Sequence, residues 1–375
     1  MRTRRACCEK CLRRSWLLSR LSILLNYSSR DCDRLLALLE LGDEELVQAI
    51  GGRRRRELTN LCERFRAEQV EQAPGVNRVC RHGPDYPRAL RSWAGAPAML
   101  HVIGQTKRLR ELTAGPVVAI VGAAKASDYG MEMARSFARG LAASGVTVVS
   151  AFADGIAAAA HAGALEADGP TVSVMAGGVD VCKPAGRREL CERVKAQGCA
   201  VAELPCGAPV PRWGGTACAR TVAGLAELTI VIEAEESSRE LVGARVAKAL
   251  DRTVAALPGR VTSPLSQGTC ALLMQGAPLV RGPADALDLL YGAGPRRPGT
   301  PHERRPAMPE PAKLEPRLRA MLEHVGAGRD TPGKLTGAGA DPGEAMLALS
   351  ELELMGLLGR GDGGRYVPRE SLAGW

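Results

Sequence analysis

The sequence predicts an α/β protein whose main domain is an extended Rossmann-like, doubly wound and mostly parallel sheet. Two observations predict this fold: buried apolar runs alternate with amphipathic segments between residues 117 and 281, and the connections between them are short. In an open parallel sheet the functional loops lie at the carboxyl ends of the strands. The expected strands are Val117–Val121, Val146–Ser150, Thr171–Met175, Ala200–Leu204, Leu228–Glu233, Thr253–Leu257 and Pro278–Arg281.

Smaller units are predicted on both sides of this domain. Residues 1–70 carry leucines at helical spacing and indicate a small all-helical domain of the SAM or helix-hairpin-helix (HhH) type. The Rossmann-like domain is expected to span residues 71–291, and its first part includes a strand near residues 96–104. Residues 292–313 are rich in Pro, Gly and Arg and favour a linker.

Residues 314–375 predict a winged-helix domain. Three helical segments, residues 314–325, 331–336 and 342–357, precede a glycine-rich turn and then Tyr366. Arg360 and Arg365 flank the expected wing, but four carboxylates make the preceding helix acidic. We therefore expect this domain to contact protein rather than to read duplex DNA. The four carboxylates are Asp341, Glu344, Glu351 and Glu353.

Composition indicates a basic protein with few aromatic side chains. The formal net charge is +9, which is compatible with a polyanionic partner such as nucleic acid, and aromatic residues make up only 3% of the chain. Twelve scattered cysteines favour reduced thiols and a cytoplasmic location. No membrane segment is expected, because the apolar run of residues 16–25 is short and contains Arg20.

One cysteine pair has the spacing of a metal site. Cys8 and Cys11 form a CxxC motif, which can supply two thiolate ligands to zinc. A second CxxC motif, or a histidine pair at finger-like spacing, is missing from the sequence. We therefore predict that the chain binds no metal and no cofactor.

Three successive strand-to-helix loops contain glycine and predict an anion-binding rim. Gly122 follows the first strand and precedes Ser127–Gly130, where backbone N–H groups and the positive helix end suit a phosphate. The segments 150–156 and 176–180 repeat this arrangement after the next two strands. The dinucleotide fingerprint GxGxxG is absent from these loops.

An ordered series of motifs resembles the DNA-processing protein family DprA, also called Smf. The series begins with Asp85-Tyr-Pro and continues through VAIVG at residues 118–122, Ser127-Asp-Tyr-Gly130, AAHAGAL at residues 159–165 and RTVAGL at residues 220–225. It closes with PGRVTSPLSQGT at residues 258–269. The resemblance covers about 200 residues and extends to the helical and winged-helix units.

The resemblance implies binding and protection of single-stranded DNA, loading of the RecA recombinase during natural transformation, a homodimer, and no catalysis. The loops depart from the family's usual pattern: Gly122-Ala-Ala replaces Gly-Ser-Arg, and Asp154 stands where an arginine is usual. Backbone binding requires positive potential more than particular side chains, so neighbouring cations can compensate. The residues predicted to bind nucleic acid are Gly122, Lys125, Ser127, Gly130, Ser150, Gly155, His161, Gly177, Arg220, Arg239, Arg245 and Arg260.

Two alternatives stay open. The lost loop arginines also suit a degenerate DprA paralogue that acts as an interaction protein with weak DNA binding. The partial match of Trp213–Thr216 to a Pro-Gly-Gly-x-Gly-Thr loop suits a Rossmann-type nucleotide-processing enzyme similar to phosphoribohydrolases. His161 is either a hydrogen-bond donor to the rim or a packed core residue.

Overall fold

The computed structural model divides the chain into two compact units, Met1–Arg296 and Arg297–Trp375. The residues that it describes are 7–70, 73–104, 106–292, 314–327, 341–355, 357–360 and 366–368, together with 329, 331 and 335. Of the predicted linker, only residue 292 lies within these ranges.

The first unit is built on an eight-stranded sheet with the order β1-β2-β6-β5-β4-β3-β7-β8. The six strands from β3 to β8 run parallel to one another, whereas β1 pairs with β2, and β2 with β6, in antiparallel fashion. The structure therefore confirms the predicted fold class. The strands are β1 (Val76–Cys80), β2 (Met99–Ile103), β3 (Val117–Val121), β4 (Thr147–Ala151), β5 (Thr171–Gly178), β6 (Cys199–Leu204), β7 (Leu228–Val231) and β8 (Thr253–Ala256).

Helices cover both faces of this sheet because the parallel strands are apolar on both sides. Along β3, Val118 and Ile120 join a core with Phe137 of α8, while Val117 and Ala119 join a second core with Val222 of α11. The helices of the sheet domain are α6 (Arg88–Arg91), α7 (Thr106–Leu112), α8 (Asp128–Ala143), α9 (Ile156–Glu166), α10 (Arg188–Gln197), α11 (Gly214–Leu225), α12 (Val242–Ala249), α13 (Pro264–Met274) and α14 (Pro283–Tyr291).

Six of the seven strands predicted from residue 117 onward are present: Val117–Val121 has the predicted bounds, and the ends of the other five differ by one to three residues. The seventh prediction was wrong: residues 278–281 form only one isolated bridge, between Leu279 and Ala256. Pro278 lacks the N–H that a regular ladder needs at that position. The predicted strand near residues 96–104 is β2, and β1 was not predicted.

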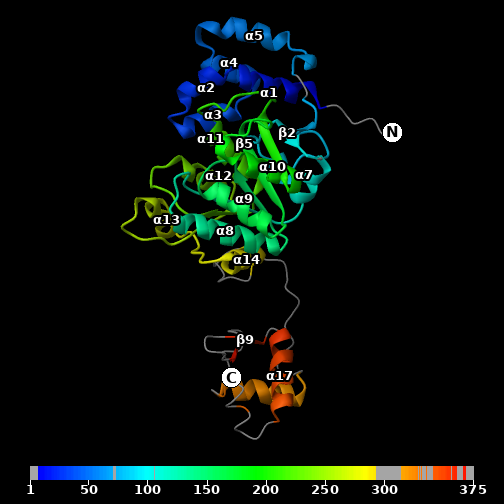
Figure 1. Ribbon diagram of the computed structural model, residues 1–375, viewed down its shortest axis with the longest axis vertical. Coiled ribbons are helices and arrows are strands. Elements are labelled where there is room, and N and C mark those ends of the chain that lie inside the picture. Colours follow the sequence, from blue (N-terminus) through cyan, green and yellow to red (C-terminus); the bar gives the residue numbers. More distant parts are fainter. Residues whose placement is uncertain are drawn as a thin grey trace, which may run out of the picture. The chain divides into compact units, whose positions relative to one another are not determined.

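Five short helices form a layer at one end of the first unit, drawn in blue in Figure 1. Their core leucines continue into the sheet domain, where Leu17 and Leu35 share one apolar cluster with Met99 and Trp213. The helical layer is thus packed directly on the sheet domain. The helices are α1 (Glu9–Arg20), α2 (Ser22–Ser28), α3 (Cys32–Glu40), α4 (Asp43–Ile50) and α5 (Arg55–Glu63).

Among its described residues, the second unit has two helices and a pair of short strands. Helices α15 (Pro316–Gly326) and α17 (Pro342–Leu354) pack through leucines, and β9 (Leu358–Arg360) pairs antiparallel with β10 (Tyr366–Pro368). Most of the predicted middle helix, residues 331–336, and the turn at residues 361–365 lie outside the described residues. The winged-helix assignment stays a prediction.

Two further observations concern the chain as a whole. A disulfide joins Cys182 to Cys191, so the expectation of reduced thiols throughout was wrong for this pair, whereas the other described cysteines are free. None of the helices in the described ranges is both long and apolar enough to cross a membrane.

Candidate nucleic-acid interface

The carboxyl edge of the sheet brings together the loops that the sequence singled out. Strand β3 lies between β4 and β7, so the chain winds outward in both directions from this point. Such a switch point is where open α/β sheets form their ligand crevices. The loops after β3, β4, β7 and β8 therefore belong to one rim, together with the first residues of the helices that follow two of them. We call this the sheet-edge rim: residues 122–129, 152–155, 232–239 and 257–263.

The N-terminus of α8 holds a carboxylate of the chain itself. Glu233, which is buried, accepts hydrogen bonds from the Ser127 backbone N–H at 2.9 Å and from the Ser127 hydroxyl at 2.5 Å. The Ser127 hydroxyl in turn accepts one from the Gly130 N–H at 3.0 Å and so caps the helix. An internal anion thus lies where the sequence predicted space for a phosphate.

Gly130 is required by this carboxylate. A Cβ atom at position 130 would overlap the Glu233 carboxyl group, so only glycine permits so close an approach. At Gly122 a Cβ atom would lie 2.7 Å from the Glu233 carbonyl oxygen, which accepts a hydrogen bond from the Ala123 N–H at the same distance. These glycines therefore have a packing role that the sequence did not reveal.

The second loop packs against the first. Gly155 has φ 65°, and a Cβ atom there would overlap the Ala123 carbonyl oxygen, which also accepts the Ile156 N–H at 3.2 Å. Ser150 is buried and donates its hydroxyl to the Ile120 carbonyl at 2.7 Å. Its hydroxyl therefore joins β4 to β3 and is not available to DNA, contrary to the prediction.

The anion that replaces the family's usual arginine has its own partner. The Asp154 carboxylate forms an ion pair with the Arg187 guanidinium, with 2.9 Å between Oδ1 and Nε, and both side chains are about half exposed. A cation from another loop thus offsets the negative charge of Asp154. Sequence reasoning missed this pair because the two residues are 33 positions apart.

His161 is a packed core residue, and its prediction as a DNA contact was wrong. Its side chain is completely buried, with Nδ1 2.8 Å from the Thr171 hydroxyl and Nε2 3.3 Å from the Ala151 carbonyl oxygen. Burial lowers the pKa of His161 to about 4, so the imidazole is neutral at physiological pH.

Gly177 is also buried, because β5 continues to Gly178 instead of ending at Met175. A Cβ atom at position 177 would lie 2.8 Å from the Ala208 carbonyl oxygen. The residue therefore lies within the strand and not on the rim, which corrects its prediction as a binding residue.

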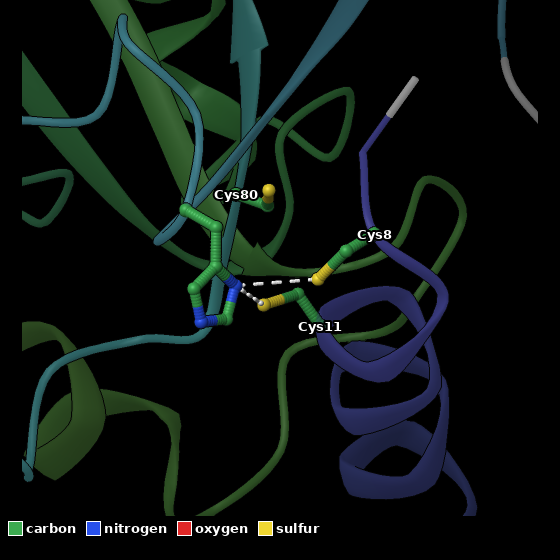
Figure 2. A group of neighbouring side chains, drawn as sticks. Cys8, Cys11 and Cys80 are labelled. Carbon is green, nitrogen blue, oxygen red and sulfur yellow. Dashed lines mark hydrogen bonds between the residues drawn. The ribbon is translucent and has the colours of Figure 1, made fainter. Parts of the chain in front are cut away.

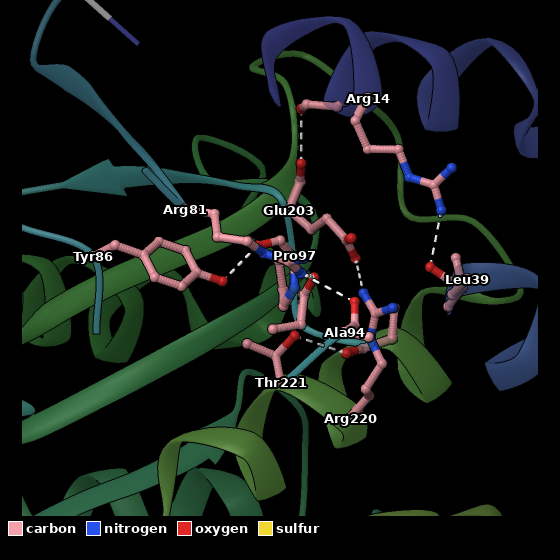
Figure 3. Close-up of polar contacts among 12 residues, drawn as sticks. Arg14, Leu39, Arg81, Tyr86, Ala94, Pro97, Glu203, Arg220 and Thr221 are labelled. Atoms are coloured by element: carbon pink, nitrogen blue, oxygen red, sulfur yellow. Dashed lines mark hydrogen bonds and ion pairs between the residues drawn. The ribbon is translucent and has the colours of Figure 1, made fainter. Parts of the chain in front are cut away.

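Arg220 points into the protein and is not a DNA contact (Figure 3). Its side chain is 1% exposed, and its Nη2 lies 2.6 Å from Oε2 of Glu203 in β6. The Glu203 backbone carbonyl accepts the Ser15 hydroxyl at 2.8 Å, so α1 is bonded to the same strand residue. The predicted phosphate contact is thus half of a buried ion pair, and its prediction was wrong.

Four of the predicted cations are exposed. Lys125 and Arg260 lie in the loops after β3 and β8, and Arg239 begins the short helix that ends the loop after β7. These are three neighbouring strands. None of these three cations takes part in an ion pair within the part of the chain that the structure describes. Arg245, on α12, differs because it lies 3.2 Å from Asp33 of the helical layer.

Tyr129 is a rim residue that sequence reasoning missed. It lies in the first turn of α8, directly after the Ser127 cap, and its side chain is 50% exposed. Aromatic side chains beside cations are the usual platforms for stacking single-stranded bases. Sequence reasoning took the low aromatic content as evidence against base stacking, but one exposed ring at the right position hardly changes the overall composition.

The loop that suggested a nucleotide-processing enzyme does not line the rim. Trp213 is buried against the helical layer, where its indole Nε1 donates to the Ser22 hydroxyl at 3.1 Å. Thr216 is also buried, 3.6 Å from the Cys32 sulfur. This segment therefore holds α11 against α2 and α3.

The fold and the rim define a class of protein: a Rossmann-like domain with exposed cations at the carboxyl edge of its sheet. The family model described as "DNA recombination-mediator protein A" matches residues 77–291, more than half of the chain. The chain belongs to this family.

Individual relatives agree with this assignment. The Smf protein of Escherichia coli (strain K12) is 33% identical over 285 residues, which are 75% of this chain and 74% of that protein. The X-ray structure of DprA from Streptococcus pneumoniae superposes with a TM-score of 0.59 at 26% identity, covering 75% of this chain and 96% of that one. DprA from Helicobacter pylori, described as having a unique single-stranded DNA binding mode, matches with a TM-score of 0.52 at 24% identity over 58% of this chain and 96% of that one.

Proposed function

We propose that this protein binds single-stranded DNA at the sheet-edge rim and acts as a recombination mediator. The observation that carries the proposal is the set of three exposed cations without ion pairs among the described residues, Lys125, Arg239 and Arg260, on loops of three adjacent strands. Family membership supports it, as does the single-stranded DNA binding that the name of the H. pylori structure gives to that relative.

The rim suits a flexible phosphate backbone. Three point charges on separate loops do not define a fixed bidentate geometry, so they favour nonspecific contacts over base readout. Tyr129 adds one exposed ring for a base that is unstacked from its neighbours. A single strand meets both requirements at once, whereas the bases of a duplex are already stacked on one another.

We propose in addition that the protein acts without catalysis, as a homodimer in the cytoplasm. Its partner would be a recombinase of the RecA class, to which it delivers single strands taken up during transformation. This part of the proposal rests on family membership. The acidic helix α17, with Glu344 and Glu351 among its residues, is proposed to contact protein and not DNA.

A titration of labelled oligo-dT at several salt concentrations tests the proposal. Three phosphate contacts on a single strand give a slope of log Kobs against log salt of about −2, because each contact contributes about −0.7. Between 50 and 200 mM salt the affinity would then fall roughly 20-fold for one rim. Absence of binding even at low salt would contradict the proposal.

Matched variants assign the contacts to the rim. Lys125→Ala, Arg239→Ala and Arg260→Ala combined should reduce the salt slope nearly to zero. A control that removes the same charge elsewhere, at cations that each pair with a carboxylate, should keep the slope. The control combines Lys107→Ala, Arg110→Ala and Arg135→Ala. An equal loss in both triple variants would mean that overall charge, and not the rim, binds DNA.

A second candidate function is an interaction protein that binds DNA weakly. It is favoured by the acidic residues of the rim: Asp154 and Glu233 are already bonded within the protein, and Asp128, Glu235 and Glu236 are exposed among the cations. In that case the oligo-dT titration would show weak binding with a slope close to zero, while the dimer and the recombinase contact would persist.

A further inference from the structure

Four metal-ligating side chains from two distant segments meet where the helical layer joins the sheet (Figure 2). Cys8 and Cys11 flank the start of α1, Cys80 is the last residue of β1, and His82 follows two positions later. The ligand atoms of these four residues all lie within 4.8 Å of one another. A Cys-x-x-Cys motif and a Cys-x-His motif, about seventy positions apart in the sequence, thus lie next to each other in the fold.

The distances around His82 match a tetrahedral metal site. Its Nδ1 lies 3.3 Å from the Cys8 sulfur and 3.4 Å from the Cys11 sulfur. One ring nitrogen has a single lone pair or a single proton, so it cannot form a full hydrogen bond with both thiols. Around zinc, bond lengths of about 2.3 Å to sulfur and 2.0 Å to nitrogen place such ligands about 3.5 Å apart.

The chemistry of the ligands selects zinc. Three sulfurs and one imidazole form the Cys₃His set of closed structural sites, and soft thiolates disfavour Mg²⁺ and Ca²⁺. Cys8, Cys11 and Cys80 are free of disulfides in the structure, so all three sulfurs can ligate. Cys8 is the N-cap residue of α1 and Cys11 lies in its first turn, so the same helix end carries both sulfurs.

We propose that Cys8, Cys11, Cys80 and His82 bind one Zn²⁺ ion that fastens α1 to β1. The site is structural, because all four tetrahedral positions are filled by the protein and none is left for a substrate. The sequence-based prediction of no metal did not include Cys80-x-His82 as the second pair of ligands. Only the tertiary fold brings this pair close to Cys8 and Cys11. Neighbouring Cys7 is not a ligand: its thiol donates to the Arg78 carbonyl at 3.2 Å.

Metal analysis of the full-length protein, purified with a non-chelating reductant, tests the site. We expect about one zinc ion per chain, and less than about a tenth of that in Cys11→Ser and in His82→Ala. Cys182→Ser is the matched control, because Cys182, Cys191 and Glu192 form the other cluster that has metal-ligand spacing within the described residues. This control should keep its zinc. Zinc lost from the control and retained in Cys11→Ser would overturn the assignment.

Cobalt substitution keeps the test valid if a cysteine variant does not fold. Co²⁺ in the unmodified protein should show the intense d–d bands of a tetrahedral site and sulfur-to-cobalt charge transfer from three thiolates. His82→Cys should retain the metal and raise the charge-transfer intensity by about one third, because a fourth thiolate replaces nitrogen. A weak octahedral spectrum, or no Co²⁺ uptake by the unmodified protein, would overturn the proposal.

Discussion

Replacing one residue of the buried pair Arg220–Glu203 tests whether Arg220 stabilises the fold or contacts DNA. In Arg220→Met the aliphatic stem is largely retained, but the guanidinium 2.6 Å from Glu203 is lost. The two side chains are 1% and 11% exposed, so water cannot replace the missing charge. Leaving one partner of a buried pair uncompensated costs about 3–5 kcal/mol of unfolding free energy.

Thermal unfolding and DNA titration together measure the effect. For a unit of 296 residues each kcal/mol shifts Tm by about 1.6 °C, so Arg220→Met should lower Tm by about 5–8 °C. Below this transition its affinity for oligo-dT and its salt slope should equal those of the unmodified protein. The double variant with Glu203→Met should recover most of the stability, because no unpaired charge stays buried.

The opposite result would refute the reasoning. If Arg220→Met kept its Tm and lost its DNA affinity, the side chain would have to reach solvent and contact phosphate. The buried pair would then be wrong, and the sequence-based assignment of Arg220 as a DNA contact would be right.

The remaining predictions concern the rim, the core and the second unit. Ala124→Arg with Asp154→Arg adds two cations and releases Arg187, so the salt slope should steepen by about 2, and an unchanged slope would contradict this. Tyr129→Ala should weaken oligo-dT binding by about 1–3 kcal/mol in anisotropy titrations while the slope stays constant. The pKa of His161 is lowered by burial from 6.5 to about 4, so unfolded chains bind more protons between these pH values and stability falls on acidification. His161 should contribute about 3 kcal/mol to the loss of unfolding free energy from pH 7 to 4 in urea titrations, so the loss should be smaller by that amount in His161→Gln. His101, whose pKa burial also lowers to about 4, should contribute a similar loss that this variant leaves unchanged. Deleting residues 310–375 should leave oligo-dT affinity unchanged.

The sequence predicts the sheet well because parallel strands are buried on both faces. Val117–Val121 is apolar throughout and was placed without error, and the strands that follow are displaced by only a few residues. Strand β1 was missed because its sequence, VNRVC, lies at the sheet edge and carries polar residues in its middle. An edge strand has one neighbour and therefore imposes a weaker apolar pattern.

The candidate site was predicted less well, because side-chain partners are set by tertiary contacts. A sequence shows that Arg220 is basic, but only the pairing of β6 with its neighbours brings Glu203 to it. In the same way, a glycine such as Gly130 signals a close approach without revealing that a carboxylate makes it. Lys125, Arg239 and Arg260 were predicted and are exposed because surface charges need no such partner.

Under the proposed function, Glu233 would determine which anions can compete with DNA at the rim. Since this carboxylate is tethered beside the N–H group of Ser127, its effective concentration there exceeds that of dissolved ions by a wide margin. Inorganic phosphate or a free nucleotide, which offers only a few charges, gains little by displacing it. A long polyanion can leave the helix end occupied and engage several exposed side chains at once. The protein is therefore expected to bind long polyanions in preference to short ones, so that free phosphate and nucleotides compete poorly with a single strand.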